Sequence, residues 1–469
     1  MPHALSLQIG STTNIPLSTA DSSPTTTGAL LLDYVPQAAA LSVTGQGVEV
    51  YASEKQLVTE SVRLWLYAAS GAALQAKIAN IERFIENMTR RQSTRSGDRG
   101  YLYIQMSSDA EVWRSEIVSA RLQMGDDTLR LWGNNGAEVL LIVTRRPFWE
   151  TVAEVAIPLD NTSAGAKTTS GVTIYNHDDA TTGHDNWVEV AAADVVGNLP
   201  APLRLKITNT SGSTLLTNYF YQAVNAHFAP TTFAHVVEGE GAYGTTTVAD
   251  ANSSGTSGFG RASWVGAINH NLYLIGWTIA NAKLIQTAGG SFRVLARFAN
   301  TPPTGIELRL SVKADPPPDL LTTLWQGPKM TATGNKLQDL GVLQLPPGAS
   351  SQNHGDIGLL LTAEYGGTGQ LDVDFLHFTP ANSTRTIKQA GFELLAGDAV
   401  INDGSEKRVY MLKSATSTEF NIFESYDSAL YVWPNQDQRI ILLHDEGAAM
   451  VIARTWLVEA WYRPRRNTL

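Results

Sequence analysis

The chain has 469 residues, of which 43% are hydrophobic and 17% charged, no cysteine, and a formal net charge of −10 at pH 7. The lack of cysteine excludes disulfides, thiolate metal sites and cysteine nucleophiles, and the acidic balance argues against general nucleic-acid binding, which needs a basic face. We expect neither a membrane span nor a signal peptide, because no apolar run approaches ~18 residues and no basic stretch precedes an apolar core.

The length suggests about three domains at ~150 residues each. Strand-length apolar runs are bounded by glycine and proline, of which the chain has 39 and 20, and this pattern predicts a mainly β protein. Residues 1–56 read as short strands at 4–9, 29–34 and 48–52 that complete a first sheet.

Residues 58–67 alternate polar and apolar side chains and predict a strand. A helix is expected over 71–92, with Ser70 as its N-cap. Its apolar residues recur at helical spacing and form one stripe: Leu74, Ile78, Ile81, Ile85 and Met88. A lone amphipathic helix needs a sheet to cover, so this region is predicted to be an α+β unit.

Further strands are expected at 101–106, 111–122 and 136–144, and the last runs into the corner Arg145-Arg-Pro-Phe-Trp149. Two basic clusters stand out in the acidic chain, and each is interpreted either as a solvated loop or tail or as a contact with an acidic partner subunit. They are Arg90, Arg91, Arg95 and Arg99, and Arg463, Arg465 and Arg466.

This order of elements resembles the ring-forming N-terminal domain of distal tail proteins, the baseplate-hub proteins of long-tailed bacteriophages. The resemblance is carried by the helix after the first long strand, the strand containing Trp113, and the closing Pro-Phe-Trp corner. It implies a ring, expected to be a homohexamer, between tail tube and tail tip proteins in a virion tail assembled in the host cytoplasm. DNA would pass through its channel without specific binding.

By analogy of position alone, the resemblance places Trp65, Tyr67, Tyr101 and Tyr103 near the joint between neighbouring copies. It also implies that the corner leads into a β-sandwich. Residues 150–216 carry strand patterns that fit its beginning, and residues 383–469 return to short strands. We expect these two segments to pair, with residues 217–382 inserted between them; the alternative is four domains in series.

Residues 217–382 contain about eight alternating runs and predict a jelly roll. Their order resembles carbohydrate-binding modules of the β-sandwich type, which implies a structural calcium ion held by an acidic pair and a late aspartate. The matching residues are Glu238, Glu240, Asp372 and Asp374, although Gly239 stands where the family commonly has alanine. The other interpretation is that these are ordinary surface acids.

Aromatic rings stack well on sugar rings, and the candidates for such a role are Trp264, Tyr273, Trp277 and Trp325. Tryptophan in β-sandwiches is more often a core or interface residue. No metal-binding histidine motif and no nucleophile elbow occurs, so we name no catalytic residue and no cofactor besides possible Ca²⁺.

The fold class predicted is mainly β: an α+β ring-forming domain (1–149), a β-sandwich (150–216 with 383–469) and an inserted jelly roll (217–382). The function predicted is structural, that of a distal tail or baseplate ring component that also binds host-surface glycan. The alternatives are a free-standing glycan-binding protein and, less favoured, an enzyme acting on polysaccharide.

Overall fold

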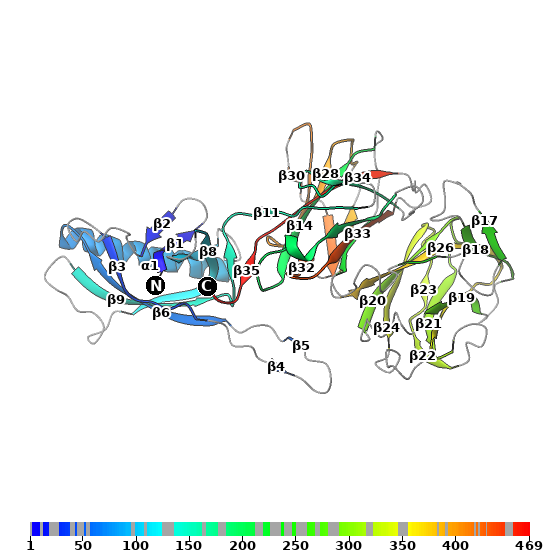
Figure 1. Cartoon of the computed structure of the whole chain (residues 1–469), viewed down its shortest axis with the longest axis horizontal. Helices are drawn as coiled ribbons and strands as arrows, with labels where there is room; N and C mark the ends of the chain where they lie inside the picture. The colour runs from blue at the N-terminus through cyan, green and yellow to red at the C-terminus, as the bar shows by residue number, and fades with distance from the viewer. Residues whose placement is uncertain are drawn as a thin grey trace. The chain divides into compact units, whose positions relative to one another are not determined.

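The computed structural model of the chain describes the following residues, and all structural statements concern them: 2–9, 13–17, 28–37, 43–44, 51–52, 57–94, 99–106, 110–123, 136–161, 166–176, 184–211, 219–225, 236–238, 246–249, 260–267, 273–279, 290–315, 322–345, 355–381, 384–389, 393–416, 419–420, 423–427, 429–445 and 454–469. The chain is mainly β and divides into two compact units (Figure 1). Unit 1 comprises 1–154, 197–199 and 463–469, and unit 2 comprises 155–196 and 200–462.

Unit 1 is built on one antiparallel sheet with the strand order β2-β1-β7-β8-β9-β6-β3. The strands are β1 (Pro2–Ile9), β2 (Thr13–Pro16), β3 (Gly28–Asp33), β6 (Val58–Tyr67), β7 (Gly100–Met106), β8 (Val112–Gln123) and β9 (Gly136–Arg145). A separate two-stranded ribbon joins β4 (Val43–Thr44) and β5 (Tyr51–Ala52). Alternation along β6 buries every even-numbered residue, as expected for a strand with one face on a core.

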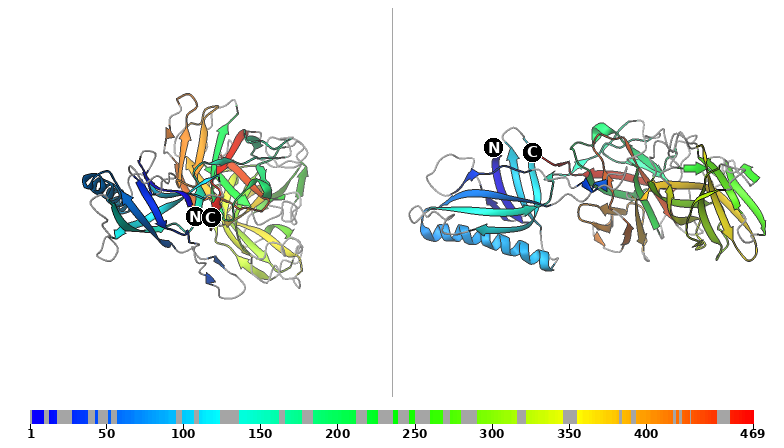
Figure 2. Two further views of the ribbon diagram at one scale, coloured as in Figure 1. Left: turned by 60° about the vertical axis from the view of Figure 1, so that its left-hand side comes forward. Right: turned by 90° about the horizontal axis from the view of Figure 1, so that it is seen from below.

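The helix expected over 71–92 is present as α1 (Gly71–Thr94) and lies along one face of this sheet (Figure 2). The Ser70 hydroxyl caps it by accepting a hydrogen bond from the Ala73 N–H at 3.2 Å. Most of the predicted stripe packs on the sheet: Leu74, Ile81 and Met88 are buried, while Ile78 and Ile85 are partly buried against the same cluster.

Unit 1 is completed by residues far along the chain. β10 (Trp149–Thr151) pairs with β8 on one side and with β35 (Arg465–Arg466) on the other. The backbone of residues 197–199 joins them, since the Asn198 N–H donates to the Arg465 carbonyl at 2.9 Å. We expected 150–154, 197–199 and 463–469 in the second domain, but all three segments belong to unit 1.

Unit 2 contains two pairs of packed sheets. The first pair has the orders β11-β34-β14-β28-β29-β30 and β13-β33-β15-β27-β31, with β12 on β34 and β32 on β14. Its strands are β11 (Val155–Ala156), β12 (Val172–Tyr175), β13 (Trp187–Val190), β14 (Ala201–Asn209), β15 (Tyr219–Asn225), β27 (Thr384–Gln389), β28 (Ala399–Asp403), β29 (Arg408–Leu412), β30 (Glu419–Phe420), β31 (Phe423–Asp427), β32 (Tyr431–Val432), β33 (Gln438–Asp445) and β34 (Thr455–Tyr462). A short 3-10 helix, η2 (Ala192–Asp194), follows β13.

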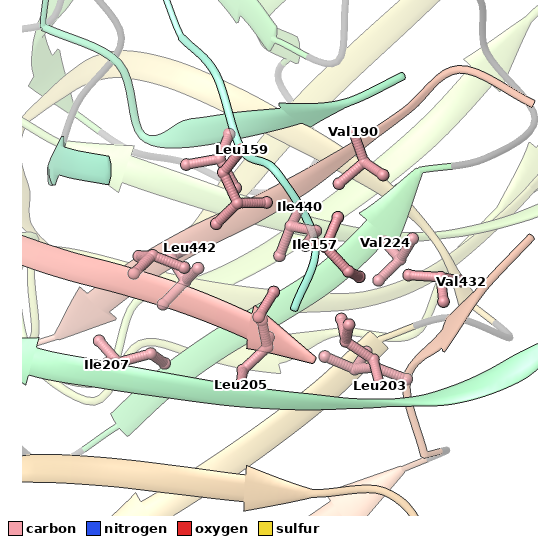
Figure 3. Close-up of a cluster of buried hydrophobic side chains, with 14 of the residues drawn as sticks. Ile157, Leu159, Val190, Leu203, Leu205, Ile207, Val224, Val432, Ile440 and Leu442 are labelled. Carbon is pink, nitrogen blue, oxygen red and sulfur yellow. The ribbon is translucent and has the colours of Figure 1, made fainter. Parts of the chain in front are cut away.

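Side chains from both of these sheets form one apolar core, in which Leu205 and Ile207 of β14 face Ile440 and Leu442 of β33 (Figure 3). Segments from both sides of 236–380 therefore make one sandwich. One boundary differs from the expectation. Residues 219–225 were expected in the inserted jelly roll, but β15 pairs with β27 and β33 and lies in the first sandwich.

The second pair of sheets has the orders β17-β18-β26-β20-β24 and β19-β25-β21-β22, with β16 on β26 and β23 on β21. Its strands are β16 (Val236–Glu238), β17 (Thr246–Ala249), β18 (Gly260–Ala267), β19 (Tyr273–Ile279), β20 (Gly290–Phe298), β21 (Glu307–Lys313), β22 (Thr323–Gln326), β23 (Met330–Thr331), β24 (Leu337–Leu345), β25 (Ile357–Glu364) and β26 (Thr368–Pro380). Their inward side chains form a second core that includes Phe292 and Leu359. Within the described residues, no helix is both long and apolar enough to cross a membrane.

Candidate functional site

The four aromatic residues predicted for an assembly joint lie on one face of the unit 1 sheet. Leu64 and Leu102 point into the cluster under α1, so the odd-numbered residues of β6 and β7 point to the opposite face. Trp65 and Tyr67 are half-buried there. The Trp65 ring lies over Gly136, where an added Cβ would come within 2.6 Å of Trp65 Cζ2.

Tyr101 and Tyr103 form a second pair on β7, with ring centroids 6.2 Å apart in an edge-on arrangement. The Arg114 guanidinium lies over the Tyr101 ring at 4.3 Å, and burial raises the pKa of the Tyr101 hydroxyl. Strands β8 and β9 separate β7 from β6, so the structure brings the four residues to one face as two pairs rather than as one cluster.

The end strands of this sheet, among the strands described, are β2 and β3. Each is paired along one side: β2 with β1 and β3 with β6. An end strand presents backbone N–H and C=O groups that another strand can bind. The outer face and the two end strands together form the candidate assembly surface of unit 1.

The C-terminal arginines make ion pairs and a ring contact within unit 1, so they do not form a free solvated tail; a contact with an acidic partner subunit stays a prediction. Arg465 binds Glu150 at 3.0 Å, and Arg114 binds the other oxygen of the same carboxylate at 3.1 Å. Arg463 pairs with Glu154 at 3.0 Å, and the Arg466 guanidinium stacks on Trp113 at 4.4 Å. These contacts hold β35 against β10. The ion pairs of Arg463 and Arg465 could not be predicted from local sequence patterns, because each joins residues more than 300 positions apart.

The arginines of the other basic cluster, residues 90–99, have different surroundings. Arg90 makes a solvent-exposed ion pair with Glu86 one helical turn away, and Arg95 lies outside the described residues. Arg91 and Arg99, joined by Arg146, line a pocket of about 270 Å³ where the end of α1 meets the sheet. Its other described lining residues are Met88, Gly100, Glu116, Ile117 and Val118.

Of the four residues predicted to hold calcium, the two whose side chains are described, Asp372 and Asp374, are bound by other protein groups. Asp374 is buried and pairs with the Arg297 guanidinium at 3.1 Å, and Asp372 accepts hydrogen bonds from Asn300 and Gln370. A guanidinium beside Asp374 opposes a cation there, so the two aspartates fit Ca²⁺ poorly. Glu238 contributes its backbone to β16, and Glu240 lies outside the described residues.

Across the described residues, no group of three or more histidine, cysteine, aspartate or glutamate side chains is placed to hold a metal. Asp374 lies at a bulge in β26. Arg297 lies opposite Phe375 while Phe298 lies opposite Val373, which leaves Asp374 as the extra residue. Such a shift of register could not be read from the alternation of the sequence.

The predicted sugar-stacking residues also differ in their surroundings. Trp277 is 1% exposed inside the core of the second sandwich, so its ring is not available to a ligand. Trp325, on the end strand β22, is half-buried and packs its ring over Gly327. Trp264 lies on β18 and Tyr273 on β19, and their side chains are outside the described part of the structure.

No protein-family model matches the chain, and no curated protein matches it by sequence. The Dit protein (gp 19.1) of phage SPP1, described as a hub adsorption apparatus of phages infecting Gram-positive bacteria, is 6% identical with 98% of each chain covered and a TM-score of 0.29. A chain of the phage P2 baseplate in its activated conformation with calcium is 7% identical with 99% of each covered and a TM-score of 0.30. The strontium form matches at 7% identity over 81% of this chain and 98% of that chain, with a TM-score of 0.23. TM-scores this low do not establish a shared fold.

Proposed function

We propose that this chain is a structural protein of a phage tail, a distal tail or baseplate ring component that links the tail tube to the tail tip. The observation that carries the proposal is the build of unit 1: one sheet, covered on one face by α1, with β2 and β3 at its ends and a half-buried aromatic face opposite the helix. This arrangement is what the sequence resemblance to distal tail proteins implies for the ring-forming domain.

Assembly follows from the chemistry of the sheet ends. Joining the β2 side of one copy to the β3 side of the next would satisfy backbone groups on both, and a head-to-tail contact of this kind closes into a ring when its rotation allows. The pair Trp65/Tyr67 lies on β6, next to the end strand β3, and the pair Tyr101/Tyr103 lies on β7, with β1 between it and the end strand β2. Tyrosine and tryptophan are enriched at protein interfaces.

The oligomeric state of the purified full-length chain tests this proposal. Mass photometry and negative-stain electron microscopy should show a ring, which we expect to be a hexamer. A single species at the monomer mass at high concentration, with no ring in images, would count against it.

Two adjacent proline substitutions separate edge pairing from folding. Ala29 and Leu30 lie in β3 opposite Leu66 and Trp65 of β6. Successive N–H groups of a strand point to opposite sides, so one of Ala29→Pro and Leu30→Pro removes a donor to β6 and the other removes an outward donor. We expect the outward variant to lose the ring while keeping a cooperative melt. Equal ring assembly by that variant would exclude β3 from the joint.

We propose glycan binding by the second sandwich as a second activity, because Trp325 is partly exposed on its end strand β22. A glycan array of the full-length chain tests it, comparing wild type with Trp325→Ala. The control is Tyr365→Ala, another partly buried aromatic packed on the same core. Binding that survives Trp325→Ala, or is lost equally in both variants, would exclude this residue as the sugar platform.

A further inference from the structure

The pocket at the end of α1 gathers positive charge in an acidic chain. Arg91 comes from the last turn of the helix, Arg99 from the residue before β7, and Arg146 from the residue after β9. Glu116 of β8 is the acidic residue in the described lining. Three guanidinium groups and one carboxylate leave the described lining with a net charge of +2.

Glu116 lies beside the Nε edge of two of the arginines and competes there with a bound anion. Its Oε2 lies 3.3 Å from Arg146 Nε, and its Oε1 lies 3.9 Å from Arg99 Nε. Within the described residues, the Nη atoms of Arg146 make no hydrogen bond of their own. The arrangement keeps a planar donor group at the pocket while leaving donors for a further acceptor.

Arg91 is the decisive residue. Its Nη1 is shielded from solvent and has no hydrogen-bond partner among the described residues. A buried guanidinium nitrogen without an acceptor lowers stability, because it has lost water and gained no hydrogen bond in exchange. An oxygen atom of a ligand entering the pocket would remove this penalty.

The pocket is also large enough to admit a ligand. Its volume of about 270 Å³ is far above the roughly 10–15 Å³ that one water needs. Gly100 lets β7 pack closely on the helix, because a Cβ there would meet Met88 Sδ at 3.1 Å and Phe84 Cζ at 3.3 Å. The floor is therefore formed by close packing of β7 on the helix.

The negative end of the α1 dipole opposes an anion at this place. It is equivalent to roughly −0.5 charge, which is smaller than the surplus of +2 on the described side chains. Arginine is suited to phosphate because its donors form a planar fork. We propose that this pocket binds a phosphate group, whether free or part of a phosphate-bearing chain. This site does not depend on ring assembly.

Calorimetric titration of the full-length chain with inorganic phosphate tests the proposal, with chloride used to match ionic strength. Removing a charged hydrogen bond costs at least ~1.4 kcal/mol, which is a tenfold change in Kd. Arg91→Gln and Arg146→Gln should each weaken phosphate binding at least about tenfold. Glu116→Gln should tighten it, because one negative charge leaves the pocket.

The matched control is Arg90→Gln, one residue from Arg91 on the same helix but 67% exposed and paired with Glu86. It should leave phosphate binding unchanged, and melting curves should show that all four variants fold. Equal losses in Arg90→Gln and Arg91→Gln, weaker binding in Glu116→Gln, or acetate binding as tightly as phosphate would each overturn the proposal. So would an absence of phosphate binding by the wild type.

Two further titrations identify the source of the phosphate. A nucleoside monophosphate and a short single-stranded oligonucleotide are compared in the wild type and in Arg91→Gln. Tighter binding of the oligonucleotide that is lost in Arg91→Gln assigns the phosphate to a nucleic-acid backbone. Equal binding of the two ligands, again lost in Arg91→Gln, assigns it to a small phosphate-bearing molecule.

Discussion

Arg145 and Glu60 form an ion pair inside unit 1, with Arg145 Nη2 2.5 Å from Glu60 Oε1 and both side chains almost wholly shielded from solvent. Glu60 Oε2 accepts from the Tyr34 hydroxyl at 2.7 Å, and Arg145 also donates to the Gln37 carbonyl at 2.7 Å. The guanidinium stacks on Trp149 at 4.3 Å. The pair therefore connects residues 34–37 and the Pro-Phe-Trp corner to strands β6 and β9 of the sheet.

Replacing Glu60 with glutamine should destabilise unit 1 by about 3–5 kcal/mol, because it leaves a buried guanidinium without its counter-charge. Burial raises the pKa of Tyr34, and the Glu60 carboxylate raises it further, so the Tyr34 hydroxyl stays protonated and donates to Glu60.

Tyr34→Phe removes this hydrogen bond and should destabilise unit 1 by about 1 kcal/mol. Hydrogen exchange of unit 1 amides measures both changes.

The comparison variant for this prediction lies in unit 2. Asp374→Asn breaks the equally buried pair with Arg297 and should lower protection in unit 2 while leaving unit 1 amides unchanged. Loss of protection in both units from either variant would contradict the division of the chain into two units.

Because Glu150 binds Arg114 and Arg465, substitutions at Glu150 and Arg465 should have non-additive effects on stability. Arg114 and Arg465 bind different oxygens of this carboxylate, so Glu150→Gln should cost more than either arginine substitution, about 2–3 kcal/mol. A double-mutant cycle of Glu150→Gln with Arg465→Gln should give a coupling free energy above ~0.5 kcal/mol. Additive effects in thermal melts would show that β35 is held by its backbone pairing alone.

Gly197 should tolerate no side chain. Its φ is +116°, and a Cβ there would lie 2.6 Å from the backbone oxygen of Arg465. Gly305 has φ +86° but nothing within 4 Å of an added Cβ. Gly305→Ala should therefore cost about 1 kcal/mol for conformational strain, and Gly197→Ala clearly more. Equal melting temperatures for the two variants would contradict the close approach of the chain segments.

Asp398 should make stability depend on acid pH. Burial acts to raise its pKa, but hydrogen bonds from Lys413 and from the Ser414 and Leu395 N–H groups outweigh burial, so its pKa lies below the ordinary value. The stabilisation is complete above the ordinary pKa of 3.8 and is lost as pH falls through the lower folded value.

The corresponding variant is Asp398→Asn, which should destabilise unit 2 at pH 7 by about 1–3 kcal/mol. Urea unfolding at a series of pH values measures the difference from wild type. That difference should shrink as the pH drops below about 4, because the wild-type carboxylate is then protonated as well. A constant difference across the series would contradict the assigned role of the charge.

Local periodicity accounts for what could be predicted from sequence. The apolar stripe from Leu74 to Met88 predicted a helix that ends two residues before the observed end of α1. The alternation in 58–67 predicted the strand that the structure shows as β6. Period-two alternation also places Trp277 on the same face as Ile275 and Ile279, and all three are buried in the core. Reading that parity would have excluded Trp277 from the sugar-binding candidates.

Long-range pairing accounts for what was missed. Arg465, which binds Glu150, and Arg463, which binds Glu154, lie more than 300 residues from these glutamates, and no composition or spacing connects them. The pocket around Arg91 needed three separate segments to converge. The basic residues were visible in the sequence, but their division into an exposed pair and a pocket is a property of the tertiary fold.

The pairing of β10 with β35 has a consequence for biosynthesis. Residues 463–469 leave the ribosome after the whole of 155–462, so unit 1 cannot finish its sheet while either sandwich is still being translated. Until then β10, which contains Trp149, lacks the strand that pairs with it, and this incomplete sheet would be accessible to chaperones and proteases. Unit 1, which is synthesised first, can therefore complete its sheet only in a chain whose C-terminal segment has also been synthesised.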